Sequence, residues 1–265
     1  MLKRNSADHG AQFLDYYERA SVSQTTFDRF NRIQKCALAL VESSQGRRDK
    51  FDVVDIGCGA GTQALIWAQV GHRVSALDAS SALVGVGQRR ALERGLDVRF
   101  SVGFAQALPY KGESFDVVLM PELLEHVAEW EACLQEAVRI LRPRGILYLS
   151  TTNKLCPVQQ EFELPAYSWY PSRLKHWIEQ KSVSTHPQWV NHTKYPAVNW
   201  FTYYSLRRWL NMRGVQTMDR FDMLARDRLN ISSKVIVAAI RRVPAIRFLA
   251  QVATEGTTVW GIKAA

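Results

Sequence analysis

The sequence lacks the features of disulfide-rich, membrane-spanning and secreted proteins. Its 265 residues include only four cysteines, and no two of them form a C-x-x-C pair. A disulfide framework and a zinc site are therefore not expected, whereas reduced structural thiols are. No uninterrupted apolar run approaches the length of a membrane span, and residues 1–9 lack the apolar core of a secretory signal. The cytoplasm is the expected location.

The chain does contain enough apolar sequence for one enzyme-sized α/β domain. Hydrophobic residues make up 47% of it, and no internal repeat or low-complexity segment interrupts them. The formal net charge of +9 raises nucleic acid as a partner. The cations are spread along the chain, however, and no RNA-binding module is recognisable, so nucleic acid is disfavoured. Acidic lipids or an anionic acceptor explain the charge equally well.

The most informative segment is the glycine-rich turn of residues 53–61, which reads VVDIGCGAG. The apolar residues before the turn predict a buried parallel strand, and a helical stretch over residues 62–69 follows at once. The glycines let the backbone turn tightly and approach a ligand, toward which the amides of the helix N-terminus would point. The dinucleotide fingerprint G-x-G-x-x-G would need a glycine where Thr62 stands. A pyrophosphate site is therefore disfavoured here.

Further blocks follow in the order expected of a doubly wound sheet, whose strand ends share one crevice. A second strand over residues 73–77 ends at Asp78, whose carboxylate can accept hydrogen bonds from ribose hydroxyls. An aspartate that merely caps the helix from Ser80 onward is the alternative. A fourth strand is expected over residues 115–120. A fifth strand is expected over residues 146–150, after a segment that closes a helix.

The pattern Asp-x-Gly-x-Gly-x-Gly of residues 55–61 resembles the first motif of class I S-adenosylmethionine-dependent methyltransferases. With PELLEHV after the fourth strand and STTNK after the fifth, residues 50–155 are similar to ubiquinone-biosynthesis O-methyltransferases, and the similarity recurs weakly over residues 201–218. The resemblance implies a Rossmann-like, doubly wound α/β fold with a seven-stranded, mostly parallel sheet. It also implies an antiparallel last strand, expected over residues 257–263 beside residues 215–221.

The resemblance further implies that S-adenosyl-L-methionine is the methyl donor and that S-adenosyl-L-homocysteine is the product. The residues expected at the cofactor are Asp55, Gly57, Cys58, Gly59, Gly61, Asp78, Ala79, Phe104, Ala105 and Glu122. Two departures from the family pattern matter. Phe104 stands where an acidic residue usually holds the adenine amine, so adenine recognition would rest on stacking or on a backbone amide. Arg144 replaces a glycine in a surface turn.

His126 is the first candidate for a base that removes the proton of a hydroxyl acceptor, because it follows the fourth strand beside the expected cofactor site. A structural hydrogen-bonding role is the alternative. Glu122, Glu125 and His126 could instead hold a divalent cation. Neighbouring side chains on a helix point in different directions, however, so no metal site is expected. The expected function is O-methylation of a small-molecule hydroxyl, such as a phenol, quinol or sugar. N-methylation of a small molecule and a non-catalytic protein with the same fold are the alternatives.

The expected regions are a helical N-terminal cap (1–48), the cofactor-binding core (49–154), an aromatic insertion after strand five (155–202) and the C-terminal part of the same domain (203–265). In the cap, apolar residues recur at helical spacing over residues 11–42, and Tyr16 and Tyr17 either line the pocket or pack on the sheet. The insertion holds four of the eight tryptophans, which favours either a lid over the acceptor or a satellite core. Within the insertion, residues 171–180 predict a helix capped by Ser172.

The C-terminal region is both basic and apolar. Six cations and one acid lie between Met223 and Ala250. Residues 244–253 predict a helix with a broad apolar face and a proline at its first position. Peripheral contact with an anionic membrane is one interpretation of this region, and packing on the core is the other.

Overall fold

The structure, a computed structural model, describes residues 19, 21–158, 164–186, 197–224 and 230–265. The chain divides into two compact units. The first unit comprises residues 1–123, 129–148 and 262–265, and the second comprises residues 124–128 and 149–261. Among the described residues, no helix is long and apolar enough to cross a membrane.

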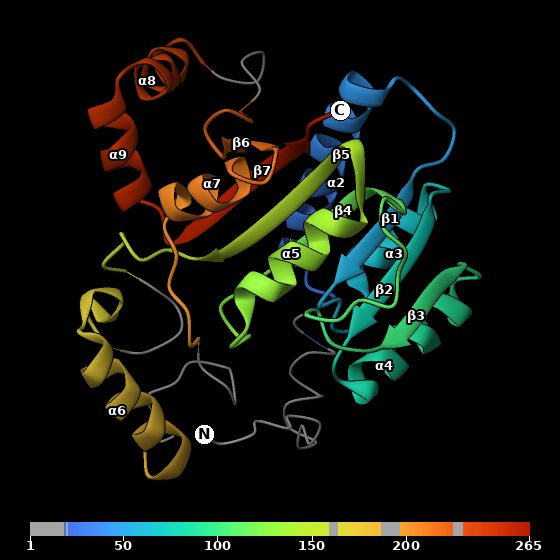
Figure 1. Ribbon diagram of the computed structural model, residues 1–265, viewed down its shortest axis with the longest axis horizontal. Helices are drawn as coiled ribbons and strands as arrows, with labels where there is room; N and C mark the ends of the chain where they lie inside the picture. Colours follow the sequence, from blue (N-terminus) through green and yellow to red (C-terminus); the bar gives the residue numbers. More distant parts are fainter. Residues whose placement is uncertain (1–18, 20, 159–163, 187–196, 225–229) are drawn as a thin grey trace. The chain divides into compact units, whose positions relative to one another are not determined.

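Seven strands form one sheet in the order β3-β2-β1-β4-β5-β7-β6 (Figure 1). They are β1 (Asp52–Ile56), β2 (Arg73–Asp78), β3 (Val98–Val102), β4 (Phe115–Pro121), β5 (Leu141–Thr152), β6 (Val215–Asp219) and β7 (Gly256–Lys263). The strand β1 pairs in parallel with both β2 and β4, and β2 pairs in parallel with β3. The strand order and the antiparallel β7 confirm the Rossmann-like α/β fold that the sequence predicts.

In the described part of the chain, one or more helices separate consecutive strands, except between β3 and β4. The helices are α2 (Gln24–Gln45), α3 (Thr62–Gln69), α4 (Ser81–Glu93), α5 (Trp130–Ile140), α6 (Ser172–Ser184), α7 (Tyr203–Asn211), α8 (Ile231–Arg242) and α9 (Pro244–Val252), with a short 3₁₀ helix, η1, at Tyr167–Trp169. The inner strands β1 and β4 are almost wholly buried, as is usual for parallel strands covered on both faces. Their carboxyl ends lead into the turns that carry the candidate cofactor residues.

Two boundaries differ from the sequence expectations. The strand β5 begins at Leu141 rather than at residue 146, because the Pro-Arg-Gly segment that suggested a turn is part of the strand. The helix α6 begins at Ser172, and its N-cap is Pro171, with no side-chain cap. The ring of Pro171 fixes its φ, here −57°, and its ψ is an extended 144°, so Ser172 is the first residue inside the helix.

The N-terminal cap and the insertion are described only in part. In the cap, α2 is capped by Ser23 and lies against α3, where the side-chain amide of Gln34 donates to Ile66 O at 2.9 Å. Tyr16 and Tyr17 lie outside the described residues. So do the insertion's aromatic residues at positions 162, 189 and 195.

The described part of the insertion contains a small core of its own. Tyr167 and Ile178 are buried, and Trp200 packs against them. The ammonium group of Lys175 lies 4.7 Å from the centre of the Trp200 ring and donates to Ser168 O at 2.7 Å. Burial lowers the pKa of Lys175 to about 8. These contacts make this part of the insertion a satellite core with one buried cation.

Candidate cofactor-binding site

The glycine turn between β1 and α3 folds back onto the end of β2. The amides of Gly57 and Cys58 donate to Leu77 O at 2.8 and 3.1 Å, and the amide of Gly61 donates to Cys58 O at 2.9 Å. The φ angles of Gly57, Gly59 and Gly61 are 75°, 52° and 77°. Residues with a side chain rarely adopt these angles, so the path of the turn depends on all three glycines.

Gly59 and Gly61 serve the turn in different ways. A Cβ atom on Gly61 would lie 2.8 Å from the ring of Phe100 and 3.3 Å from the Cα of Gly87, which is closer than packing allows. Gly61 therefore permits the close approach of α3, α4 and β3. A Cβ atom on Gly59 would meet no atom within 4 Å. Gly59 thus leaves open space in front of the backbone, as a close-fitting ligand would require.

Asp78 holds the turn in place through its carboxylate. Its Oδ2 accepts from the amide of Gly59 at 2.8 Å, and its Oδ1 accepts from the amide of Ser80 at 2.8 Å. The N-cap of α4 is Ser80, whose hydroxyl accepts from Leu83 N. Asp78 therefore does not cap the helix itself. Because a carboxylate oxygen can accept more than one hydrogen bond, Asp78 keeps the capacity to accept hydrogen bonds from ribose hydroxyls.

Asp55 is fully buried at the end of β1, immediately before the glycine turn. Neither carboxylate oxygen makes a hydrogen bond of standard geometry with a described residue. Burial and, to a smaller extent, the negative charge of Asp78 raise the pKa of Asp55 to about 7, against the opposing effect of the backbone amide of Ala64. The amide group of Gln63, also buried, likewise lacks a hydrogen-bond partner among the described residues. Each buried polar group without a hydrogen-bond partner lowers folding stability by about 1–3 kcal/mol. A ligand that supplied hydrogen-bond partners would recover this free energy.

Cys58 lies inside the turn but is not a candidate nucleophile. Burial raises the pKa of its thiol well above the ordinary value, and the charges of Asp55 and Asp78 raise it further. The thiol is therefore protonated at neutral pH, whereas a reactive cysteine needs a stabilised thiolate. The four cysteines are all free.

The charges around the turn favour one class of ligand over another. Asp55 and Asp78 interact unfavourably, as the pKa of Asp55 shows. A phosphate group would add to this repulsion, whereas a ligand with a cationic group or hydroxyl donors would relieve it. S-adenosylmethionine has both an ammonium and a sulfonium group, and it has no phosphate. The residues of the turn therefore fit this cofactor.

The loop after β3 carries the expected adenine-side residues. Phe104 is 58% exposed, and Ala105 is buried beneath the loop. Phe104 O accepts from Ala107 N at 3.1 Å, which closes a turn at this position. Ala79, after β2, is exposed. The open face of the Phe104 ring is thus available for stacking.

Glu122 follows β4 and is engaged by a residue of the N-terminal cap. Arg29 of α2 makes two hydrogen bonds to its carboxylate, one of them 3.2 Å between Nη2 and Oε2. Glu122 itself has a φ of 52°, which is uncommon for a residue with a side chain. No local sequence pattern marks Arg29 for this role, because Glu122 lies far from it along the chain.

The N-terminal segment also reaches the glycine turn. The hydroxyl of Thr62 donates to Ser21 O at 2.8 Å, and Arg90 Nη1 donates to Ser21 Oγ at 2.9 Å and to Ala60 O at 3.3 Å. Thr62, the residue that replaces the last fingerprint glycine, therefore attaches the chain before α2 to the start of α3. Ser21 and Arg90 carry no sequence signal for this role.

His126 lies in an exposed turn after β4, not on a helix. The adjacent Glu125 is buried, and its carbonyl oxygen accepts from the amides of Val198 and Asn199 at 2.7 and 3.2 Å. The Asn199 side chain also donates to Leu124 O at 3.0 Å. Glu125 and His126 both belong to the second unit. Within the described part of the chain, no three His, Cys, Asp or Glu side chains form a metal-binding group.

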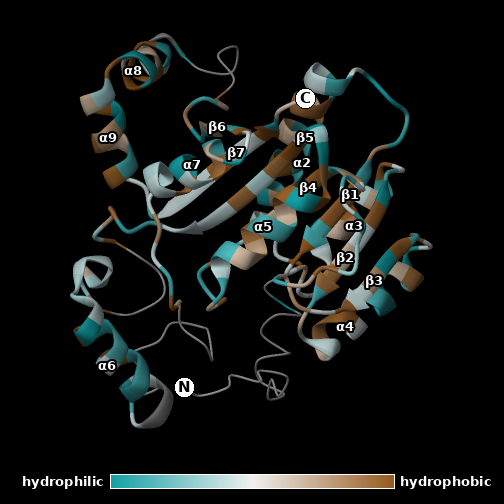
Figure 2. Ribbon diagram, in the orientation of Figure 1, coloured by the Kyte–Doolittle hydropathy of each residue, from teal (hydrophilic) through white to brown (hydrophobic). Residues whose placement is uncertain are grey.

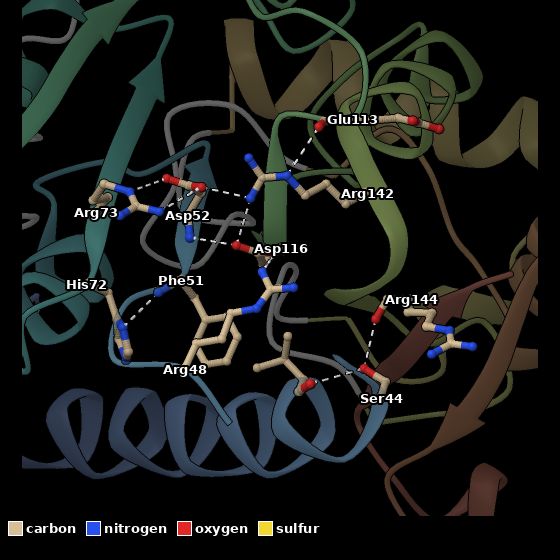
Figure 3. Close-up of polar contacts among 11 residues, drawn as sticks. Ser44, Arg48, Phe51, Asp52, His72, Arg73, Glu113, Asp116, Arg142 and Arg144 are labelled. Atoms are coloured by element: carbon tan, nitrogen blue, oxygen red, sulfur yellow. Dashed lines mark hydrogen bonds and ion pairs between the residues drawn. The ribbon is translucent and has the colours of Figure 1, made fainter. Parts of the chain in front are cut away.

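A separate charge network lies where β1, β4 and β5 begin (Figure 3). Arg142 Nη1 donates to Asp52 Oδ2 at 2.7 Å and to Asp116 Oδ2 at 2.8 Å, and Arg48 Nη1 donates to Asp116 Oδ1 at 3.3 Å. The hydrogen bond from Arg73 lowers the pKa of Asp52, and so does the one from Arg142. An adjoining hollow of about 400 Å³ is lined by Gln45, Arg48, Glu113, Arg142, Pro143 and Arg144. Because the glycine turn follows the opposite end of β1, this hollow is distinct from the candidate cofactor site.

Comparison with known proteins gives matches to the middle of the chain. A family described as "Methyltransferase domain" matches residues 54–149. The chain is 35% identical over 126 residues to the ubiquinone biosynthesis O-methyltransferase of Caulobacter vibrioides, which covers 46% of this chain and 50% of that protein. It is 34% identical over 102 residues to the protein of the same name from Chelativorans sp., which covers 38% of this chain and 40% of that protein. The chain thus spans half or less of the length of these relatives.

Solved structures resemble the chain over most of its length. A SAM dependent methyltransferase from Aquifex aeolicus has a TM-score of 0.56 at 13% identity, covering 94% of this chain and 97% of that one. The phosphoethanolamine N-methyltransferase 2 of Haemonchus contortus, in complex with S-adenosyl-L-methionine, has a TM-score of 0.54 at 14% identity, covering 96% and 60%. At such identities the likeness shows the fold alone.

Proposed function

Residues 54–149 form a class I S-adenosylmethionine-dependent methyltransferase domain, and from this premise we propose that the protein is an O-methyltransferase of a small-molecule hydroxyl. The observation that carries the proposal is the pair of carboxylates, Asp55 and Asp78, beside the open space at Gly59. The pair favours a cationic ligand with hydroxyl donors and disfavours a phosphate. The similarity to ubiquinone biosynthesis O-methyltransferases supports oxygen as the acceptor atom.

When bound, the cofactor supplies a methyl group that its sulfonium has already activated. We propose that the carboxylate of Asp78 accepts hydrogen bonds from the ribose hydroxyls and that the charge of Asp55 attracts the cationic end of the ligand. The ring of Phe104 would stack on the adenine. Gly57, Cys58, Gly59 and Gly61 would shape the backbone surface, and Ala79, Ala105 and Glu122 would complete the lining of the site.

The remaining task of the protein is to orient the acceptor, exclude water and remove a proton. We propose that the imidazole of His126 accepts the proton of the acceptor hydroxyl. The support for this role is its place in the chain, just after β4 and Glu122. The insertion, with its aromatic rings, is proposed to cover a small, mainly apolar acceptor.

Direct binding tests the proposal most simply. Isothermal titration with S-adenosylhomocysteine should give saturable binding, and heat-denatured protein should release any cofactor that co-purifies. Asp78→Ala should raise the dissociation constant about tenfold or more, because hydrogen bonds from the ribose hydroxyls to a carboxylate contribute about 1.5–3 kcal/mol in total. Asp97→Ala, at an exposed site after α4, serves as the control. If the wild-type protein bound neither S-adenosylmethionine nor S-adenosylhomocysteine, the proposal would be contradicted. A non-catalytic protein with this fold would then remain.

Turnover tests the acceptor and the base. The protein should be incubated with a labelled methyl donor and a panel of phenols, quinols, sugars and amines. The products should then be identified by mass spectrometry. Methylated hydroxyl products are expected, whereas methylated amines alone would make the protein an N-methyltransferase. His126→Ala should lower kcat by about 10²-fold or more, as for the loss of a general base, and should leave cofactor affinity unchanged. An unchanged kcat would remove His126 from this role.

A further inference from the structure

The helices α8 and α9 expose large apolar side chains to solvent. The exposed fractions are 65% for Val235, 59% for Ile236, 42% for Val243, 39% for Ile246, 45% for Phe248 and 65% for Leu249. Tyr204 of α7, itself 37% exposed, stacks on Phe248 with 6.3 Å between the ring centres. Figure 2 shows hydrophobic residues on both helices. These seven side chains are termed the α8–α9 apolar face.

Polar side chains of the same two helices point the other way, toward the end of β6. Arg247 Nε and the side-chain amide of Gln251 both donate to Asp219 Oδ2, each at 2.8 Å, and Asp219 is fully buried. Arg241 donates to the carbonyl oxygens of Phe221, Asp222 and Leu224 at 2.8–3.0 Å. Three of the polar side chains are thus committed to the protein interior.

On α9 this arrangement is the reverse of an ordinary surface helix. In a surface helix the apolar stripe faces the core and the polar residues face water. On α9 the side toward the protein is held by ion pairs and hydrogen bonds, and the large apolar residues remain outside. The helix α8 buries Val237 and Ile240 but also exposes large apolar side chains. Burying such a side chain is favourable by about 1.5–3 kcal/mol. Large apolar side chains exposed on two packed helices indicate an interaction site.

The charge of the two helices identifies the kind of partner. Residues 231–252 contain four cations and no aspartate or glutamate. Of the four, Lys234 and Arg242 are exposed. A symmetric contact with a second copy would bring these cations against each other. A nucleic acid would match the charge but not the apolar side chains. An anionic bilayer matches both, because acyl chains accept the apolar residues and head groups attract the cations.

We propose that the α8–α9 apolar face docks the protein on the surface of an anionic lipid bilayer. The apolar side chains enter the boundary between head groups and acyl chains, while Lys234 and Arg242 contact the anionic head groups. The phenol of Tyr204 suits the same boundary, where aromatic rings with a polar tip are common. This surface function is additional to methyl transfer and does not depend on the identity of the acceptor.

Vesicle co-sedimentation of the full-length protein tests the proposal. Vesicles of phosphatidylcholine mixed with phosphatidylglycerol should bind the protein, and vesicles of phosphatidylcholine alone should bind it much less. The double variant Phe248→Ser/Leu249→Ser should lower the partition coefficient on the order of a hundredfold, because each buried side chain contributes about tenfold or more. Lys234→Gln and Arg242→Gln should each lower it about fivefold, and added salt should weaken binding.

Matched variants separate docking from general stickiness. Leu92→Ser removes an apolar side chain that is 83% exposed on α4, and Arg94→Gln removes a cation at the end of the same helix. Both should bind vesicles as the wild type does. Far-ultraviolet circular dichroism and S-adenosylhomocysteine binding should be unchanged in every variant, which shows that each one folds.

Three results would overturn the proposal. The first is a wild-type protein that binds neither kind of vesicle. The second is a Phe248→Ser/Leu249→Ser variant that binds anionic vesicles as strongly as the wild type. The third is a wild-type dimer, seen by sedimentation equilibrium, that the double variant converts to a monomer while vesicle binding is unaffected; the occupant of the face would then be a second copy of this chain.

Discussion

At the scale of single residues, Asp55 makes cofactor binding depend on pH. Its pKa is raised to about 7 by burial and by the charge of Asp78, so a large share of the carboxyl groups is protonated at pH 6. A cationic ligand favours the ionised form. The affinity for S-adenosylmethionine should therefore rise about tenfold between pH 6 and pH 8, because the Asp55 carboxyl ionises over this range. Isothermal titration across this range measures the change.

The variant Asp55→Asn provides the control, because it cannot ionise. Its affinity should be weak and nearly independent of pH. In the absence of ligand, folding stability changes with pH in the opposite direction to ligand affinity. A carboxyl whose folded pKa is raised binds more protons in the folded state than in the unfolded state, so its contribution to stability falls as pH rises from about 4 to 7. Asp55→Asn should remove that part of the decline, and a pH-independent wild-type affinity would contradict the assignment.

Gly59 and Gly61, two of the three glycines of the turn, should respond differently to an added methyl group. Gly59→Ala should cost about 1 kcal/mol of folding stability, owing to its positive φ, and should raise the cofactor dissociation constant about tenfold by filling the open space. Gly61→Ala should cost about 2–4 kcal/mol, because its Cβ also overlaps the Phe100 ring. Urea denaturation and ligand titration on both variants separate packing from ligand approach. Equal effects of the two variants on stability would contradict this division.

Phe104 offers a test of how the adenine is held. Phe104→Ala should raise the dissociation constant about tenfold, because stacking of a base on an aromatic ring contributes about 1–3 kcal/mol. Phe104→Asp introduces the acid that the resemblance to methyltransferases implies at this position and should bind the cofactor more tightly than Phe104→Ala. Exposed Phe104 contributes little to the core, so both variants should fold. Identical affinities for wild type and Phe104→Ala would exclude stacking on this ring.

At the scale of elements, the charge network at the start of β1, β4 and β5 should matter for stability and not for the cofactor. Arg142→Ala leaves Asp116, which is only 1% exposed, with the backbone amide of Asp52 at 2.9 Å and the longer contact to Arg48 at 3.3 Å. Because the Arg142 side chain is 33% exposed, the expected loss is about 2 kcal/mol, below that of a fully buried pair. Arg47→Ala, whose side chain is 89% exposed and 3.7 Å from Glu42, should lose less than about 0.5 kcal/mol.

The pH dependence of this loss has a definite sign. The pKa of Asp52 is lowered by its hydrogen bond to Arg73 and by Arg142. A lowered carboxyl pKa stabilises the folded state above the ordinary value, and that stability is lost as pH falls through the folded value. The difference between wild type and Arg142→Ala should therefore be full at pH 7 and shrink below about pH 4. A difference that does not change on acidification would show that Arg142 acts through packing alone.

Sequence patterns locate the elements of this protein well because the patterns are local. The buried runs of β1 and β4 and the glycine turn between β1 and α3 follow from hydrophobicity and spacing alone. The contacts of Arg29 with Glu122, and of Ser21 with Thr62 and Arg90, join residues far apart along the chain. No periodicity marks such pairs. The N-cap of α6 was wrong for a related reason: Ser172 is a good cap by type, but Pro171 already sets the start of the helix.

The orientation of α9 likewise depends on residues distant along the chain, which sequence patterns do not reveal. Its apolar residues predict a broad apolar face, but sequence alone does not decide whether that face meets the core or the solvent. The decision comes from Asp219 at the end of β6, which is buried and binds Arg247 and Gln251. A buried carboxylate needs such partners, and they draw the polar side of α9 inward.

At the scale of the whole molecule, the proposed functions fall on different units. All the proposed cofactor residues belong to the first unit, whereas His126 and the α8–α9 apolar face belong to the second. Saturating S-adenosylhomocysteine should therefore slow amide hydrogen exchange most strongly in residues 55–62, 76–80 and 103–106 and in the segment around Ser21. At a ligand concentration one hundred times the dissociation constant, the stabilisation is about 2.7 kcal/mol, or about a hundredfold in exchange by global unfolding.

The second unit provides the internal comparison in the same experiment. If the two units unfold separately, amides of α8 and α9 should exchange at the same rate with and without ligand. If they unfold together, the most slowly exchanging amides of both units should slow by the same factor, while only the glycine turn gains additional local protection. Asp78→Ala should reduce the effect in either case, because it weakens ligand binding itself. Protection that begins in α8 and α9 and spares residues 55–62 would place the cofactor elsewhere and contradict the site.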